Sequence, residues 1–179
     1  MQKFVRFAAS FLSLIALPLF AAELRIGDHA PAFALVNPAD ASTVAMNPID
    51  GHVKVVVFTS RDCAASQDFV PRLTELANRY GHRGVEFFAI DTHAAADPDA
   101  VYPTLADPDR SAAYAYGATV TPEAFVIDGA GVVRYHGYID ETSNAADRKA
   151  SPVLAALNAL LAGREAAGVE TKAYGCGLR

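Results

Sequence analysis

The two cysteines of this 179-residue chain are the side chains best suited to covalent chemistry. Cys63 follows an apolar run, residues 53–59, and a short polar stretch. Three positions further on, where a second cysteine would complete a Cys-x-x-Cys pair, the chain has Ser66. Cys176, the other cysteine, lies three residues from the end between two glycines. The arrangement suits thiol–disulfide exchange in which any partner of Cys63 lies outside its own motif.

The elements around Cys63 favour a reactive thiol. The apolar run predicts a strand buried on both faces, and residues 64–80 predict the helix that follows it. Cys63 is then expected at the helix N-terminus, where unpaired N–H groups and the helix dipole lower the pKa of a thiol from its free value of about 8.5. Arg61 would lower this pKa further, whereas Asp62 and Glu123 would raise it. The alternative is a structural cysteine buried in the core.

The remaining pattern predicts alternating strands and helices. The helix over residues 64–80 contains Pro71, which removes a backbone hydrogen bond and kinks the helix. Its apolar face consists of Phe69, Leu73, Leu76 and Tyr80, with Arg72, Glu75 and Arg79 on other faces. The other expected elements are an extended segment at 24–36, turns at 37–53, a strand at 85–90, a loop at 91–109 with a brief extended stretch at 101–105, a short helix at 110–116, a hairpin of strands 124–127 and 132–138, a helix at 152–161 and little pattern after residue 163.

The first 22 residues have the pattern of a secretory signal. Lys3 and Arg6 precede an apolar stretch that ends at two alanines. We therefore expect export to the periplasm or outside the cell, with membrane contact only through an uncleaved signal. The expected parts are a signal peptide at 1–22, a domain at 23–163 and a tail at 164–179.

The charge balance argues against nucleic acid as a partner. The chain has 15 basic and 20 acidic residues, and the signal segment contains two of the basic ones. The mature part keeps 13 basic and 20 acidic residues, a net charge of −7. A mixed, acidic surface is not the electrostatic footprint of a nucleic-acid-binding protein.

The order of these elements and three short motifs resemble the thioredoxin superfamily, and in particular its redoxin and peroxiredoxin branch. Pro71 follows Cys63 by eight positions, as the kink proline does in the family's active-site helix. Thr121-Pro122 precedes an expected strand, like the family's threonine–cis-proline pair, and residues 27–33 (GDHAPAF) are similar to the motif that begins redoxin domains. The resemblance implies an α/β, thioredoxin-like fold with a central mixed sheet flanked by helices. It also implies a cis-Pro122 beside Cys63.

Two departures from the family bear on the reaction. Peroxiredoxins have a proline seven positions and a threonine three positions before the reactive cysteine, where this chain has Val56 and Ser60. They also have an arginine at the strand edge that Pro122 and Glu123 occupy here. Groups that would polarise a peroxide are missing, which favours thiol–disulfide exchange over peroxidase activity.

The end of the chain resembles a subgroup of exported redoxin-like proteins. The similar segments are residues 171–176 (TKAYGC), 121–123 (TPE) and 137–140 (GYID). The resemblance implies that Cys176, on a glycine-flanked mobile tail, pairs with Cys63 within one chain. The alternatives are a free tail thiol and a disulfide between chains.

Together, the residues and the resemblance predict an exported thiol–disulfide oxidoreductase that needs no cofactor. Its partners would be thiols or disulfides of proteins or small molecules, with Cys63 as the nucleophile and Cys176 as the resolving cysteine. Supporting roles are expected for Ser66 as a hydrogen-bond donor to the thiolate, Thr121 and Pro122 at the substrate edge, Pro71 in the helix, and the charged Arg61 and Glu123 nearby.

Two other classes of function stay open. A Cu(I)-binding module would use Cys63, Cys176 and His93, since thiolate and imidazole ligands suit Cu(I). A non-catalytic binding domain would keep the two cysteines permanently oxidised or would seal Cys63 in the core. The pattern favours no particular oligomeric state.

Overall fold

The computed structural model describes residues 24–93, 100–147, 151–166 and 168–178, and the expected signal peptide lies outside these ranges. The described helices are α1 (Ala64–Tyr80), η1 (Gly81–Arg83, a 3-10 turn), α2 (Ser111–Tyr116) and α3 (Pro152–Leu161). The described strands are β1 (Phe33–Asn37), β2 (Ser42–Met46), β3 (Val53–Thr59), β4 (Val85–Asp91), β5 (Thr104–Ala106), β6 (Val120–Thr121), β7 (Glu123–Ile127), β8 (Val133–Gly137), β9 (Val169–Glu170) and β10 (Cys176–Gly177).

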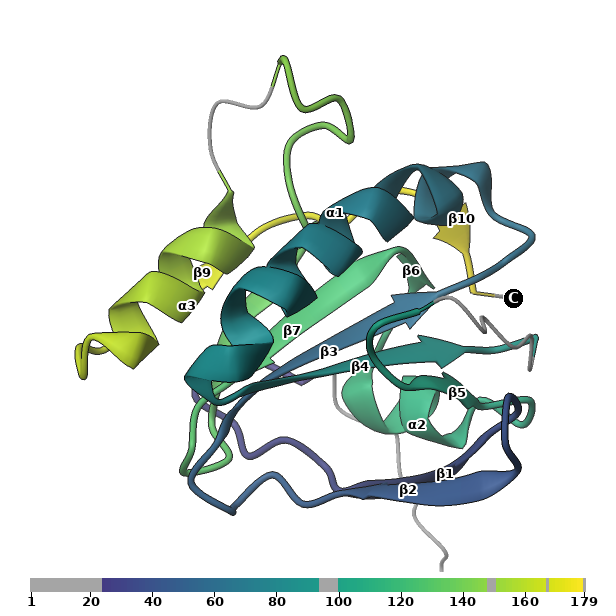
Figure 1. Cartoon of the computed structure of the whole chain (residues 1–179), viewed down its shortest axis with the longest axis horizontal. Helices are drawn as coiled ribbons and strands as arrows, with labels where there is room; N and C mark the ends of the chain where they lie inside the picture. Colours follow the sequence, from purple (N-terminus) through teal and green to yellow (C-terminus); the bar gives the residue numbers. More distant parts are fainter. Residues whose placement is uncertain (1–23, 94–99, 148–150, 167, 179) are drawn as a thin grey trace, which may run out of the picture.

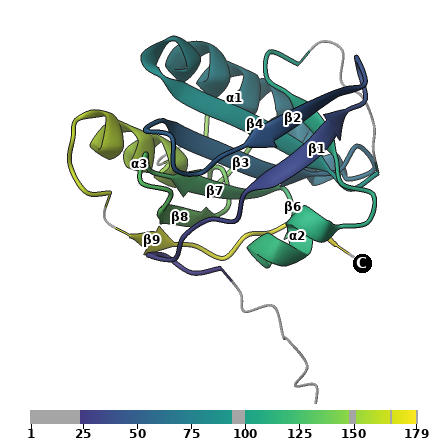
Figure 2. The ribbon, with the colours of Figure 1, turned by 90° about the horizontal axis from the view of Figure 1, so that it is seen from below.

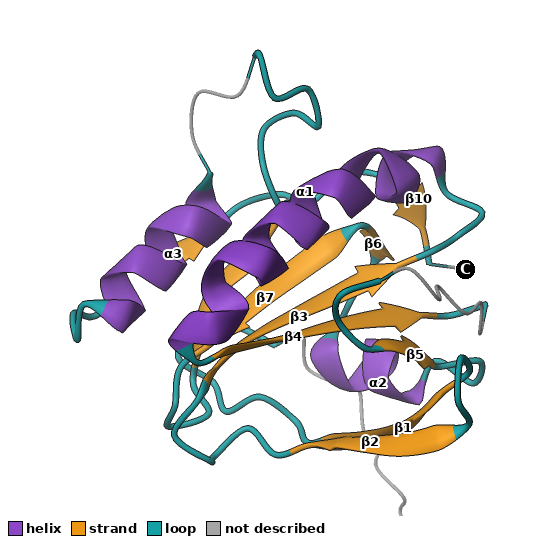
Figure 3. Ribbon diagram, viewed as in Figure 1, coloured by secondary structure: helices purple, strands orange, loops and turns teal. Residues whose placement is uncertain are grey.

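Eight of these strands form one mixed sheet in the order β2-β1-β5-β4-β3-β7-β8-β9 (Figures 1 and 3). The pairs β3–β4, β4–β5 and β8–β9 are parallel, whereas β1–β2, β1–β5, β3–β7 and β7–β8 are antiparallel. The remaining strands, β6 and β10, form a two-stranded antiparallel sheet. Helices flank the main sheet, with α1 and α3 on one face and α2 on the other (Figures 1 and 2). This confirms the thioredoxin-like architecture that the resemblance implied.

The strand that leads to Cys63 is the centre of the sheet. β3 lies between β4 and β7, and its residues 55–58 are buried because helices and loops cover both faces. Lys54 in the same strand is also fully buried, and its Nζ pairs with Asp50 and lies 3.7 Å from Glu86. The apolar core on one side forms between the sheet and the helices α1 and α3. The core on the other side contains an aromatic group of Phe58, Tyr116 and Phe125.

The strongly periodic segments fold as predicted. The helices at 64–80 and 152–161 have the expected bounds, and Ser151 begins α3 by accepting a hydrogen bond from the Leu154 N–H. The expected hairpin is β7 and β8, with a register shift at Val126/Ile127. Phe69, Leu73, Leu76 and Tyr80 are buried against the sheet, as their spacing predicted.

Three predictions of local structure were wrong or incomplete. The turn-rich stretch contains β2, and the tail contains β9 and β10, whereas the brief extended stretch expected at 101–105 corresponds in part to β5. These short strands exist because they pair with segments elsewhere in the fold, which local pattern does not reveal. Arg72, expected away from the apolar face of α1, is 5% exposed, and its Nε lies 2.6 Å from Asp140 Oδ2. A buried partner makes this position compatible with a charge.

In the part of the chain that the structure describes, no helix has both the length and the apolar character needed to cross a membrane.

Candidate functional site

Cys63 lies at the junction of β3 and α1, at the N-cap position of the helix. Its carbonyl accepts the N–H of Gln67 at 3.1 Å, and its own N–H donates to Ser60 O at 3.2 Å. The first turn of α1 contains no acidic side chain, so nothing within that turn opposes the positive end of the helix dipole. Cys63 is only 1% exposed. The sequence prediction of a cysteine at a helix N-terminus is confirmed.

Cys63 forms a disulfide with Cys176. The Cα atoms are 5.9 Å apart, and the bond joins positions separated by 113 residues. Cys176 is exposed, unlike its partner, and it begins β10. Cys176 pairs with Thr121 and Gly177 pairs with Val120, so the tail adds a strand to the segment that precedes Pro122. The Leu178 N–H continues this pairing by donating to Thr119 O at 2.9 Å.

The tail that carries Cys176 is docked along the protein in this disulfide-bonded form, and it contains two short strands where the sequence predicted little pattern. Thr171 N–H donates to His136 O at 2.9 Å, and the Thr171 hydroxyl accepts from Tyr138 N–H at 3.2 Å. The Tyr174 hydroxyl donates to the carbonyls of residues 140 and 141. Figure 2 shows this C-terminal segment, in yellow, running from β9 past β6 to the end of the chain.

Gly175 fits where a larger residue would not. Its φ is +153°, and a Cβ built on it would lie 1.9 Å from Thr121 O. Gly177, on the other side of Cys176, would place a Cβ in open space. Glycine is therefore required before Cys176 by the close approach of two backbones, and not after it.

The threonine–proline motif lies beside the disulfide. The Thr121–Pro122 peptide bond is cis, and Cys63 Sγ lies 3.2 Å from Thr121 O. This sulfur carries no proton in the disulfide, so the approach is a contact and not a hydrogen bond. Pro71 lies inside α1, eight residues after Cys63. The structure thus brings four of the predicted site residues to one place: Cys63, Cys176, Thr121 and Pro122.

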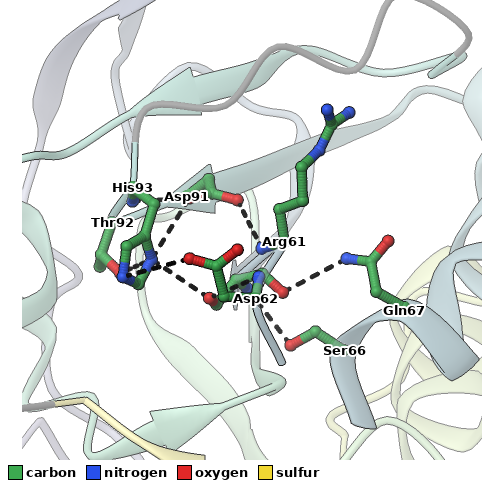
Figure 4. Close-up of polar contacts among 8 residues, drawn as sticks. Arg61, Asp62, Ser66, Gln67, Asp91, Thr92 and His93 are labelled. Atoms are coloured by element: carbon green, nitrogen blue, oxygen red, sulfur yellow. Dashed lines mark hydrogen bonds and ion pairs between the residues drawn. The ribbon is translucent and has the colours of Figure 1, made fainter. Parts of the chain in front are cut away.

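Ser66 and Arg61 have contacts that sequence reasoning did not predict. The fully buried Ser66 Oγ accepts the Ser60 N–H at 3.3 Å, which fixes the end of β3 against the first turn of α1. The Arg61 N–H donates to Asp91 Oδ2 at 3.0 Å (Figure 4).

A polar network holds the loop before Cys63 to the end of β4 (Figure 4). The buried Asp91 accepts the N–H of Arg61 through Oδ2 and the N–H of His93 through Oδ1, at 3.0 and 2.6 Å. His93 Nδ1 lies 3.2 Å from Ser60 Oγ, and that hydroxyl accepts the Asp62 N–H at 3.3 Å. Asp91 was not singled out from the sequence, and its place at the end of a parallel strand was the available signal.

His93 does not complete a metal site with the two cysteines. Across the described ranges, no group of three or more histidine, cysteine, aspartate or glutamate residues lies in an arrangement that could hold a metal ion. The sulfurs of Cys63 and Cys176 are bonded to each other in this form. The Cu(I) alternative therefore gains no support from the geometry.

Glu123 forms a buried pair with His136, and the sequence analysis had assigned no role to His136. Glu123 Oε1 lies 2.5 Å from His136 Nε2, and its Oε2 accepts the N–H groups of Thr119 and Val120 at 2.7 and 3.2 Å. Burial alone would raise the pKa of Glu123, but the hydrogen bonds from His136 and from the two backbone N–H groups lower it below its usual value. The carboxylate therefore holds β6, on which β10 docks.

A cavity of about 480 Å³ adjoins this pair. Its lining comes from β6 and its neighbour Thr119, from the Glu123–His136 pair, and from tail residues 170–173. One wall of the cavity is therefore formed by the tail that the Cys63–Cys176 disulfide attaches to the domain.

The sequence matches the model of the AhpC/TSA family over residues 26–136, more than half of the chain. The chain belongs to the AhpC/TSA family. Membership supports a thioredoxin-like redox function, but the family does not specify a single reaction. None of the curated proteins matches the chain significantly.

Solved structures with the same fold cover most of the chain. An uncharacterized conserved protein from Geobacillus kaustophilus is 26% identical, with a TM-score of 0.77 over 92% of this chain and 97% of that one. A putative thiol:disulfide interchange protein DsbE from Chlorobium tepidum is 24% identical, with a TM-score of 0.55 over 62% of this chain and 83% of that one. AhpC of Mycobacterium tuberculosis is 19% identical, with a TM-score of 0.58 over 81% of this chain and 97% of that one. At these identities, the similarity to the DsbE and AhpC structures shows a shared fold.

Proposed function

We propose that the protein is an exported thiol–disulfide oxidoreductase in which Cys63 and Cys176 exchange between a dithiol and a disulfide. The observation that supports this is the disulfide between a cysteine at the N-terminus of α1 and a cysteine on the strand docked at Thr121. Membership of the AhpC/TSA family supports redox chemistry at this place. The substrates are disulfides and thiols of proteins or small molecules.

In the reduced protein, the Cys63 thiolate attacks one sulfur of a substrate disulfide. A bond forms between Cys63 Sγ and that sulfur, and the other substrate sulfur leaves as a thiolate. The Cys176 thiolate then attacks Cys63 Sγ, which forms the Cys63–Cys176 disulfide and releases the second substrate thiolate. The substrate disulfide is reduced by two electrons and the protein dithiol is oxidised by two.

The surrounding groups suit these steps. The N-terminus of α1 stabilises the Cys63 thiolate through its unpaired N–H groups and its dipole. Ser66 fixes the first turn of that helix through its bond to Ser60, and Pro71 lies further along the same helix. Thr121 and Pro122 shape the edge at which a sulfur meets Cys63. Arg61 and Glu123 set the nearby charge.

A peroxide is not proposed as the substrate. Val56 and Ser60 replace the proline and threonine that the resemblance to peroxiredoxins would require. Pro122 and the internally paired Glu123 stand where those enzymes have an arginine. The site therefore has no cationic side chain at that position to polarise a peroxide.

A second candidate function is a binding domain with a permanent structural disulfide. The observation that favours it is the burial of Cys63, together with the hydrogen bonds that hold the tail in place. Inaccessible structural disulfides have low reduction potentials and resist reduction by cellular thiols.

Equilibration of the native protein across glutathione and dithiothreitol redox buffers separates the two candidates. Alkylation and intact-mass measurement would report how many cysteines are free at each potential. We expect both thiols to appear together with one midpoint inside the buffer range, because the two cysteines form one two-electron couple. A bond that stays closed in every buffer would overturn the redox proposal and support the structural candidate.

The alkylation rate of Cys63 in the Cys176→Ser variant tests the activated thiolate. We expect the rate to rise with pH with a midpoint below the free value of about 8.5, because the helix N-terminus stabilises the thiolate. Labelling only in denaturant would contradict this role and support a cysteine sealed in the core.

A further inference from the structure

The C-terminal tail is attached to the domain in two separate parts. Residues 169–171 lie along β8, whereas residues 174–178 contact α1 and β6. Between these two parts, Lys172 and Ala173 line the cavity of about 480 Å³ and form no hydrogen bond with any other described residue. The two attachments are therefore independent of each other.

Thr171 anchors the first part of the tail. Its backbone N–H donates to His136 O at 2.9 Å. The Tyr135 hydroxyl donates its single proton to Tyr138 O, so the Thr171 hydroxyl, 2.7 Å from that phenol oxygen, must donate to it. The Tyr138 N–H in turn donates to Thr171 Oγ1 at 3.2 Å. These three bonds form a closed ring in which the threonine hydroxyl is both donor and acceptor.

This anchor belongs to the folded sheet and does not depend on the disulfide. Tyr135 is buried in the core, and a Cβ built on Gly137 would lie 2.1 Å from Thr171 Oγ1, so the tail packs directly on the backbone of β8. None of these contacts involves α1 or either cysteine. The second part of the tail, by contrast, contains Cys176, and the bond to Cys63 holds it in place. Opening the bond therefore releases the second part and leaves the first part docked.

From this arrangement we propose that Thr171 is a positioning residue, the pivot from which Cys176 moves when the disulfide is open. The proposal rests on the proposed redox function and adds what sets the rate at which Cys176 returns to Cys63. With the anchor in place, the free segment that carries the sulfur is residues 172–176, five positions. Without the anchor, it begins after α3 and is residues 162–176, fifteen positions.

A shorter free segment raises the effective concentration of Cys176 near Cys63. For a flexible chain this concentration falls with about the −3/2 power of the segment length, so a change from five to fifteen residues lowers it about fivefold. The Cys176 thiolate competes with external thiols for the mixed disulfide between Cys63 and the substrate. An external thiolate that attacks the substrate sulfur would restore the Cys63 thiolate and leave that sulfur in a new disulfide. The anchor therefore favours complete reduction of the substrate.

Stoichiometric dithiobis(nitrobenzoate) separates the two steps in the reduced protein. The Cys63 thiolate bonds to one reagent sulfur, and the other leaves as thionitrobenzoate. The Cys176 thiolate then attacks Cys63 Sγ and releases the second thionitrobenzoate. Stopped-flow absorbance resolves a first phase that depends on reagent concentration and a closing phase that does not. If the reagent reacts first with Cys176, the closing rate depends on the same effective concentration.

Substitution of Thr171 tests the pivot. Thr171→Val keeps the shape of the side chain and removes both hydrogen bonds of the hydroxyl. We expect the closing phase to slow about fivefold and the first phase to stay unchanged, because Cys63 and α1 are not altered. Thr171→Ser keeps the hydroxyl and should close at the wild-type rate. Closing of Thr171→Val at the wild-type rate, equal slowing of both phases, or slow closing of Thr171→Ser would overturn the proposal.

Two insertions give a matched pair that leaves Thr171 unchanged. An eight-residue Gly/Ser segment is placed either after Thr171 or before the anchor, between the exposed Gly163 and Arg164. We expect closing to slow about fourfold for the first insertion and to stay unchanged for the second, because only the first lengthens the free segment. Equal slowing by both insertions would contradict an anchor at Thr171.

Failure of the pivot and failure of the proposed function give different results. A wild-type protein that shows no closing phase, or whose disulfide stays closed in every redox buffer, would refute the proposed function. Normal phases in the wild-type protein, together with unchanged closing in Thr171→Val, would overturn the pivot alone.

Discussion

The two cysteines of the site are held by different physical means. Cys63 is fixed by the core: it follows the largely buried strand β3 and is the N-cap of the 17-residue helix α1, which packs against the sheet. Cys176 is fixed by a two-residue strand, a few hydrogen bonds and the disulfide itself. The difference implies that reduction loosens one side of the site and leaves the other in place. The redox cycle proposed above requires a nucleophile that is fixed in place and a resolving cysteine on a segment that can move.

The largest expected effect comes from removing the cross-link. Cys176→Ser and chemical reduction should each lower the free energy of unfolding by about 4–5 kcal/mol, because the bond closes a loop of more than a hundred residues. Urea unfolding of the oxidised, reduced and variant proteins would measure this. If the variant were clearly less stable than the reduced wild-type protein, the Cys176 side chain would contribute to stability in addition to the cross-link.

The next effect concerns the buried pair that holds β6. Glu123→Gln should lower the free energy of unfolding by about 2–4 kcal/mol at neutral pH, because it removes the buried carboxylate bonded to His136 and to two backbone N–H groups. The same variant should make the disulfide easier to reduce, since β10 docks on β6. A loss of stability with an unchanged midpoint potential would show that β6 stays in place without the carboxylate.

The pH dependence of stability reports on the same group. The folded-state pKa of Glu123 lies below its usual value of 4.5, so the unfolded chain binds a proton more readily than the folded protein. Its contribution to stability is therefore present above pH 4.5 and is lost as the pH falls through the folded-state pKa. Urea midpoints measured between pH 7 and 3 should fall less in Glu123→Gln than in wild type; parallel curves would contradict this assignment.

Substitution of the glycine before Cys176 should have a smaller effect on stability, confined to the docking of the tail. Gly175→Ala should destabilise the oxidised form by about 1–3 kcal/mol, through strain at a positive φ and the contact with Thr121 O. The corresponding rise in midpoint potential is about 20–60 mV. Gly177→Ala is the control, with no expected change. A reduced form destabilised as much as the oxidised form would show that the tail stays docked after reduction.

The smallest effect is expected from one hydroxyl of the tail. Tyr174→Phe removes the hydrogen bonds to the carbonyls of residues 140 and 141 but keeps the ring that packs on Phe69. We expect a loss of about 0.5–1.5 kcal/mol in the oxidised form only. Unfolding of the oxidised and reduced variant in parallel would measure it, and a loss in both forms would place Tyr174 in the permanent fold.

Much of the fold and part of the site follow from local sequence. The continuous apolar run of β3, the helical spacing of α1 and the proline at the start of α3 each specify an element through neighbouring residues. The position of Cys63 at a helix N-terminus follows from the predicted strand and the predicted helix on either side of it. Local periodicity carries this information because burial of one face depends on residues a few positions apart.

Only the tertiary structure decided the rest of the site. Residues 169–170 and 176–177 are too short for their sequence pattern to predict strands. They form the strands β9 and β10 because β8 and β6 provide backbone hydrogen-bonding partners. Likewise, the sequence pattern placed Arg72 away from the apolar face of its helix without indicating its partner Asp140, and it gave no role to His136, which β8 places beside Glu123. Each of these pairs joins residues that are distant in sequence or on different strands. Their energy depends on burial and geometry that exist only once the chain has folded.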